Sequence, residues 1–258
     1  EYWPTQEWRT SPPEKQGMKA SVLEDVVTAI GNQGLPIHSV LIIRNGYLVA
    51  ETYFRRFHKD TMHQIYSVTK SIVSALVGIA IDKGFITGIE QPVLSLFPER
   101  RIIRDLERKR ALTVEYLLTM QSGLEWQEMV TPMHRSPDWV QFVLDLPLTA
   151  DPGTQFIYCS GNMHLLSAMI GKTTGMDPLK FAREVLFDLL GISDFRGRRD
   201  PQRSPNGGWG LWMRPRDMAK IGYLYLNMGV WDGQQLLSAE WVEQSQQPYV
   251  LNEGAYEP

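Results

Sequence analysis

The stretch Tyr66-Ser67-Val68-Thr69-Lys70-Ser71 decides the fold of this chain, because it opens the most hydrophobic segment of the sequence. Residues 67–83 are apolar nearly all round and are followed by Gly84, which predicts a helix in the protein interior. Three residues make almost one helical turn, so Ser67 and Lys70 project from the same face. The stretch therefore predicts a central helix with an alcohol and an amine paired at its start.

The pair Ser67 and Lys70 is typical of a nucleophile and its base. A serine hydroxyl attacks poorly alone, and a neutral amine beside it can accept its proton. Burial favours the neutral amine because it penalises charge. The helix start also offers free backbone N–H groups and the positive end of the macrodipole, which favour a developing oxyanion. We therefore expect Ser67 to be the nucleophile and Lys70 its base.

The bare S-x-x-K pattern also fits a simpler structure, in which Ser67 caps the helix and Lys70 is exposed in the first turn. Ordinary composition predicts about one such pattern in a chain of this length. The context favours the catalytic interpretation, because the pattern follows a predicted hairpin and opens a buried helix.

The hairpin is predicted from two β-rich runs, 39–44 and 47–54, joined by Asn45-Gly46, which suits a type I′ turn. An apolar stripe over residues 18–30 predicts a helix before it. The chain after residue 83 is expected to be mostly helical, without repeats. The further expected helices are 113–120, a segment from Ser136-Pro137 onward, 162–170, 177–190, 215–228 and 238–246.

A second polar cluster, Phe156-Ile157-Tyr158-Cys159-Ser160-Gly161-Asn162, follows the turn Asp151-Pro152-Gly153 and precedes a predicted helix. The Tyr158 phenol can move a proton between Ser67 and a leaving group, and Ser160 can hydrogen-bond the substrate or Lys70. The alternative is that Tyr158 is a packed aromatic side chain.

Composition narrows the function classes. The 258 residues are 43% hydrophobic, enough for one large domain or two packed lobes, and the net charge of -3 argues against a surface for nucleic acid. The basic run 100–110 is interpreted as a solvated helix face. The single cysteine, Cys159, excludes an internal disulfide and a cysteine-based metal cluster. We expect no metal and no cofactor.

Together these segments resemble the serine β-lactamase and penicillin-binding superfamily, in particular its branch of class C β-lactamases, family VIII esterases and nylon-oligomer (6-aminohexanoate-dimer) hydrolases. The resemblance implies that Ser67 forms an acyl-enzyme, that Lys70 is the base for acylation, and that Tyr158 protonates the leaving group and later activates water. Gln127 matches a position that lines the substrate cleft, and Ser160 stands where class C enzymes carry Asn. Besides the Ser67 stretch, the resemblance rests on Leu41-Ile42-Ile43-Arg44-Asn45-Gly46, Leu117-Leu118-Thr119-Met120-Gln121-Ser122-Gly123-Leu124 and Trp231-Asp232-Gly233.

The superfamily implies an α+β fold, in which an antiparallel sheet with flanking helices lies beside an all-helical lobe. We expect one domain, with residues 1–66 and 206–258 in the mixed lobe and 67–205 in the helical lobe. The third motif of the family, a Lys, His or Trp followed by x-Gly on an inner strand, is not found after Trp241. The strands that complete the sheet are therefore expected from a C-terminal segment or a second chain.

Two segments imitate that third motif. Lys172-Thr173-Thr174-Gly175 is interpreted as a helix C-cap, and Trp231-Asp232-Gly233 as the turn between two helices rather than part of a strand.

The sequence thus predicts a serine hydrolase that acts through an acyl-enzyme on a small ester or amide. The alternative is a receptor that is acylated at Ser67 without turnover. A Ser-His-Asp hydrolase is disfavoured because no G-x-S-x-G occurs, and a zinc hydrolase because no H-x-x-x-H occurs. The sequence starts at Glu1 rather than Met, which a removed export signal or trimming explains, so a periplasmic or secreted location is favoured over a cytoplasmic one.

Overall fold

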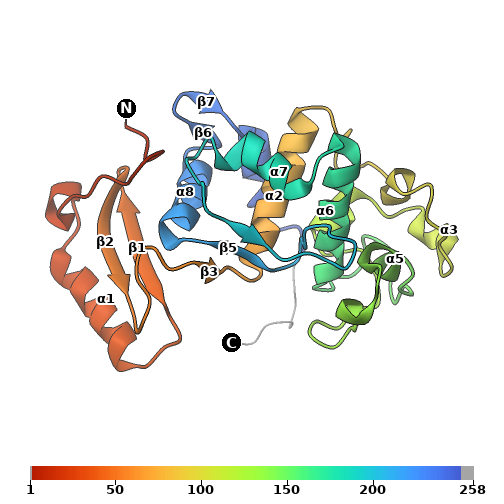
Figure 1. Cartoon of the computed structure of the whole chain (residues 1–258), viewed down its shortest axis with the longest axis horizontal. Coiled ribbons are helices and arrows are strands. Elements are labelled where there is room, and N and C mark those ends of the chain that lie inside the picture. Colours follow the sequence, from red (N-terminus) through yellow and green to blue (C-terminus); the bar gives the residue numbers. More distant parts are fainter. Residues whose placement is uncertain (1, 251–258) are drawn as a thin grey trace.

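The computed structural model of the chain describes residues 2–250. At one end, α1 (Ala20–Asn32) lies beside a hairpin of β1 (Ser39–Arg44) and β2 (Tyr47–Tyr53), as Figure 1 shows. Asn45 and Gly46 have φ angles of 51° and 77°, as a type I′ turn requires. The predicted helix and hairpin are confirmed.

The central helix is α2 (Val68–Asp82), which begins at the Ser67 stretch. Ten of its residues are buried, and α6 (Ser160–Thr174) and α9 (Ala239–Ser245) pack against it. A Cβ atom at Gly78 would lie 2.6 Å from the indole ring of Trp241, so the glycine permits the close approach of α9. The apolar pattern of this segment is thus explained by packing on more than one side.

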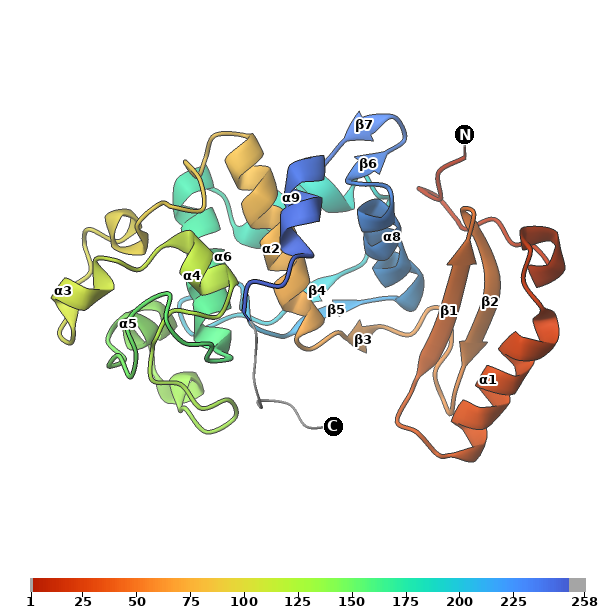
Figure 2. The same ribbon diagram turned by 180° about the vertical axis from the view of Figure 1, so that it is seen from behind.

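Apart from α8, which packs against β1, the helices that follow α2 lie away from the hairpin, as Figures 1 and 2 show. Contacts of α4 and α5 with α6 form the part of the core beyond α2. These further helices are α3 (Leu106–Lys109), α4 (Val114–Leu118), α5 (Trp139–Leu144), α7 (Pro178–Ala182) and α8 (Pro215–Leu226). Across residues 2–250, none of the helices has the length and apolar character needed to cross a bilayer.

The strands form three small antiparallel sheets in the described part of the chain, where one sheet with flanking helices was expected. Besides β1–β2 they are β3–β5–β4 and β6–β7. The hairpin is separate because α8 packs against β1 and lies between it and β5 (Figure 2). The fold is nevertheless mixed α and β with antiparallel pairing, and the assignment of residues to two lobes stays a prediction. The short strands are β3 (His63–Gln64), β4 (Arg196–Gly197), β5 (Leu211–Met213), β6 (Val230–Trp231) and β7 (Gln234–Gln235).

The strand β5 fixes the start of α2. The Ile65 N–H donates to the Leu211 carbonyl at 2.9 Å, and the Leu211 N–H donates to Thr69 Oγ1 at 3.2 Å. Ser67 lies between these two bonds along the chain, so the sheet holds the Ser67 segment from both sides.

The basic run 100–110 is mostly solvated, as expected, but little of it is helical and one of its lysines is buried. It contains only the single turn α3, and Lys109 is 1% exposed. The Lys109 ammonium donates to the carbonyls of Arg104 at 2.9 Å and Leu144 at 2.7 Å. Burial is tolerated because the amine is hydrogen-bonded to two carbonyls, one of them at the end of α5.

Three further expectations have different outcomes. Gly175, with φ of 68°, ends α6, so the predicted helix C-cap is confirmed. Asp232 and Gly233, with φ of 47° and 75°, form a hairpin turn between β6 and β7, so Trp231 does lie on a strand, contrary to the prediction. The expected helix 177–190 is divided into α7 and a π-helical turn, Arg183–Phe187.

Candidate active site

Ser67 lies exposed at the N-terminal end of α2, and Lys70 is buried, with 8% of its surface accessible. The Lys70 ammonium donates a hydrogen bond to Ser67 Oγ at 3.1 Å. Ser67 makes no capping hydrogen bond with its side chain. The geometry therefore contradicts the simpler alternative, in which Ser67 caps the helix and Lys70 is exposed.

A backbone carbonyl from a distant segment completes the surroundings of the amine. Lys70 Nζ donates to the carbonyl oxygen of Gly208 at 2.7 Å. The Asn206 side chain holds this segment, because its Oδ1 accepts from the N–H groups of Gly208 at 2.8 Å and Trp209 at 3.3 Å. The amine is thus fixed between a hydroxyl and a carbonyl. Sequence reasoning missed Gly208, since a backbone carbonyl has no side-chain signature.

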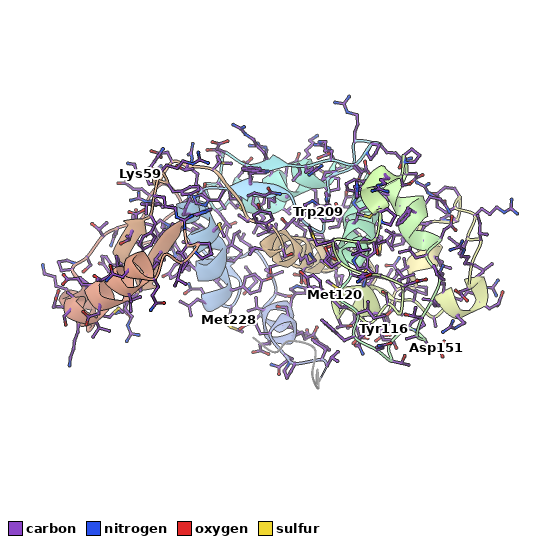
Figure 3. All side chains as sticks on the ribbon, turned by 90° about the horizontal axis from the view of Figure 1, so that it is seen from below. Lys59, Tyr116, Met120, Asp151, Trp209 and Met228 are labelled. Atoms are coloured by element: carbon purple, nitrogen blue, oxygen red, sulfur yellow. The ribbon has the colours of Figure 1, made fainter. Side chains whose placement is uncertain are left out.

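Tyr158 lies in the same site. Lys70 Nζ is 4.8 Å from the centroid of the half-buried Tyr158 ring, and the phenol makes no hydrogen bond among the described residues. Two bonds to Met120 hold the loop: the Ile157 N–H donates to its carbonyl at 2.8 Å, and the Cys159 N–H to its sulfur at 3.4 Å. Figure 3 shows Met120 near α2. The structure therefore brings together the three predicted catalytic residues.

Ser160, one of the two predicted substrate-binding residues, is hydrogen-bonded to the side chain of Glu128. Its Oγ donates to Glu128 Oε1 at 2.7 Å, and its N–H donates to Glu128 Oε2 at 3.2 Å. The indole N–H of Trp126 also donates to Glu128 Oε2, at 2.6 Å. Glu128 therefore fixes the loop that follows Tyr158. Sequence reasoning missed it, because its partner Ser160 lies 32 positions away along the chain.

Gln127 is exposed, and its side chain is bonded neither to Ser67 nor to Lys70 among the described hydrogen bonds. Its N–H donates to Thr131 Oγ1 at 2.9 Å, which places Gln127 in a turn next to Glu128. A role in lining the substrate cleft stays a prediction.

The free N–H groups expected at the start of α2 are mostly used. Val68, Thr69 and Lys70 donate to the carbonyls of the residues three positions earlier, each at 3.0 Å. The Ser67 N–H donates to none of the described residues, which leaves it available for a ligand.

Burial raises the pKa of the Cys159 thiol, next to Tyr158, to about 12, so Cys159 stays protonated and does not compete as a nucleophile.

A cavity of about 540 Å³ adjoins the buried amine. Its walls come mainly from α2, α8 and the end of α9, and include Lys70, Met120, Met163, Met213 and Tyr225. The predominantly apolar lining suits an uncharged group of a small molecule. Among residues 2–250, no three His, Cys, Asp or Glu side chains are grouped so that they could hold a metal ion.

A comparison with known protein families shows which family the chain belongs to. A family model described as Beta-lactamase matches residues 15–255. The chain belongs to the β-lactamase family. The predicted resemblance is confirmed, and so is the expected mixed α and β fold.

Individual members of the β-lactamase family are similar over most of the chain. A 6-aminohexanoate-dimer hydrolase from Paenarthrobacter ureafaciens is 28% identical over 224 residues, which cover 79% of this chain and 55% of that protein. The chain therefore spans about half the length of this curated relative.

Two solved structures of low identity share the fold. The octameric penicillin-binding protein homologue from Pyrococcus abyssi has a TM-score of 0.69 and 20% identity, over 90% of this chain and 61% of that chain. EstCE1, a hydrolase with promiscuous acyltransferase activity, has a TM-score of 0.70 and 15% identity, over 88% and 77%.

Proposed function

We propose that this protein is a serine hydrolase that acts through an acyl-enzyme on a small ester or amide. The observation that carries the proposal is the buried Lys70 amine, 3.1 Å from Ser67 Oγ. Membership in the β-lactamase family supports it, as does the likeness to a 6-aminohexanoate-dimer hydrolase.

In the proposed acylation, the neutral Lys70 amine accepts the Ser67 proton while Oγ attacks the substrate carbonyl carbon. The Ser67 N–H and the positive end of α2 stabilise the oxyanion of the tetrahedral intermediate. Tyr158 delivers a proton to the departing alcohol or amine, and the carbonyl re-forms as acyl-Ser67. The Tyr158 phenolate then takes a proton from water, which attacks this ester. Lys70 returns its proton to Ser67 Oγ as the acid is released, so that Ser67, Lys70 and Tyr158 regain their starting states.

We assign the acyl group on Ser67 to the apolar cavity that Lys70 lines. Gln127, which does not line this cavity, is assigned to the rim of the cleft. Ser160 is assigned to substrate binding through its place beside Tyr158, with its orientation set by Glu128. Because Ser160 stands where class C β-lactamases carry Asn, an esterase or linear-amide hydrolase is favoured over an antibiotic hydrolase within this class C-like branch.

The proposal includes further strands, from a C-terminal segment or a second chain, that add to the sheet near the cavity. Its support is that the chain spans 55% of the curated relative and that its strands form separate small sheets. A periplasmic or secreted location also stays a proposal.

The experiment is hydrolysis of p-nitrophenyl acetate and butyrate by the purified protein. We expect continuous release of nitrophenol and its loss in Ser67→Ala. Ser21→Ala, which removes an exposed serine near the start of α1, is the control and is expected to retain activity. Unchanged activity in Ser67→Ala refutes the nucleophile. A single stoichiometric burst followed by stable labelling at Ser67 supports the receptor alternative instead.

A further inference from the structure

We propose that the buried pair His164 and Asp200 is a positioning device for Lys70, which holds residues 198–210 so that the Gly208 carbonyl meets the amine. The inference rests on the proposed function, because it concerns the base of that reaction.

The pair lies outside the residues that meet Ser67. His164 is on α6 and Asp200 follows β4, both side chains are fully buried, and His164 Nε2 lies 3.2 Å from Asp200 Oδ2. The carboxylate accepts, so the ring donates. The other carboxylate oxygen accepts from the Ser204 N–H at 2.7 Å. Buried polar groups are tolerated only where they are hydrogen-bonded, which means that the pair restricts the geometry of the segment it joins to α6.

Hydrogen bonds continue from this pair to the carbonyl that holds the amine. The Asp200 N–H donates to the Ser204 carbonyl at 2.9 Å, which closes a turn, and the Ser167 hydroxyl on α6 donates to the Pro205 carbonyl at 2.8 Å. The next residue is Asn206, whose Oδ1 accepts from the Gly208 N–H. Hydrogen bonds thus connect Asp200 to Gly208 through residues 204–206.

Aromatic contacts form a second connection. The His164 ring meets Trp139 of α5 edge-on, with centroids 5.3 Å apart, and Trp139 stacks on Trp209 at 5.9 Å. Trp209 follows Gly208 directly, and Figure 3 shows it near α2. Loss of the His164 ring therefore loosens the segment from both directions.

The segment lies directly on the backbone of α6, so its position has little tolerance. A Cβ atom at Gly207 would lie 2.0 Å from the Met163 carbonyl oxygen, and one at Gly208 would lie 2.8 Å from the Ser160 carbonyl oxygen. Because the backbones approach too closely for a side chain, the segment has little room to move, which limits where the Gly208 carbonyl points. The pair and these glycines together determine the distance from that carbonyl to Lys70.

The test measures the rate at which a fluorophosphonate probe labels Ser67, together with kcat and KM for p-nitrophenyl butyrate. We expect His164→Phe, which keeps a ring but removes the donor, to slow labelling and kcat by about 10-fold or more with KM within about 2-fold. His164→Gln, which keeps an N–H donor, is expected to recover most of the rate. Asn206→Ala frees the Gly208 N–H directly and is expected to give the same slow labelling.

Val93→Ala is the stability control, because Val93 is fully buried in the 3-10 helix Val93–Leu96, outside the 198–210 segment. We expect it to lower the melting temperature without slowing labelling. Folded His164→Phe and Asn206→Ala that label at the wild-type rate overturn the inference, and so does slowing by Val93→Ala to the same extent. If His164→Phe does not fold, Asp200→Asn, which places an amide donor against either the His164 ring or the Ser204 N–H, decides in its place: slow labelling supports the inference and wild-type labelling overturns it. Equal labelling of Ser67→Ala and wild type overturns the proposed function itself.

Discussion

Replacement of Gly208 by Ala tests the carbonyl contact of Lys70 by a single added methyl group. The Cβ atom would lie 2.8 Å from the Ser160 carbonyl oxygen and 2.9 Å from Ser160 Cβ. Ser160 begins α6 and is itself held by Glu128, so its backbone has little freedom to retreat. We expect the Gly208 segment to move instead, which takes its carbonyl away from the present 2.7 Å contact with Lys70 Nζ.

The magnitude has two parts. Overpacking of a dense site costs about 1–3 kcal/mol of folding stability. Loss of one hydrogen bond at the amine costs about 0.5–3 kcal/mol, depending on its charge. If that second loss falls on the transition state for acylation, the rate drops by about 10-fold for each 1.4 kcal/mol. We therefore expect Gly208→Ala to lower kcat/KM by about 2- to 100-fold.

The assay is stopped-flow acylation by p-nitrophenyl butyrate, with thermal unfolding measured on the same samples. Gly31→Ala is the matched control, because a Cβ atom at Gly31 meets no atom within 4 Å in α1. It is expected to raise stability by about 0.5–1 kcal/mol and to leave acylation unchanged. Wild-type acylation by a measurably destabilised Gly208→Ala would refute the reasoning, because the carbonyl would then have moved without affecting the base.

Three further predictions concern single side chains. Glu128→Gln replaces one of two acceptor oxygens by a donor facing Ser160 or Trp126, so urea unfolding should show a loss of about 1–3 kcal/mol, and an unchanged midpoint contradicts this. The Arg216 hydrogen bond lowers the pKa of the Glu51 carboxyl below its ordinary 4.5. The ionised carboxylate therefore stabilises the folded protein above that pH, and this stabilisation is lost as pH falls through the folded pKa. Melting temperatures of Glu51→Gln should depend less on acid pH than those of wild type. Burial lowers the pKa of Lys109 from 10.5 to about 8, so the unfolded chain binds more protons between these values and stability should rise with pH there; Lys109→Met should remove this rise in melts from pH 8 to 10.

The sequence predicted those parts of the fold that local chemistry determines. The hairpin follows from Asn45-Gly46, and α2 follows from an unbroken apolar run. The strands β3, β4 and β5 were not predicted, because segments of two or three residues carry no alternation and are defined only by pairing with distant partners. Lys109 in the basic run was misinterpreted for a related reason. Its charge suggested that the side chain faces solvent, but the amine donates to the Leu144 carbonyl, 35 positions away along the chain.

The candidate site divides in the same way. Ser67 and Lys70 were found because one helical turn joins them, and Tyr158 because a loop before a helix can reach a cleft. Glu128 and Gly208 were not found, since each acts through contacts with residues far along the chain. Long-range partners of short polar segments are not encoded in any local pattern.

The two partners of the Lys70 amine lie three and 138 residues away along the chain. During synthesis, α2 emerges long before Gly208 does. A nascent chain at that stage carries the Ser67 alcohol and the Lys70 amine, but not the Gly208 carbonyl that binds the amine. Reactivity toward esters should therefore appear only after the ribosome has passed the later segment and the chain has closed on itself. In that case, the onset of acylation would report the moment at which folding is complete.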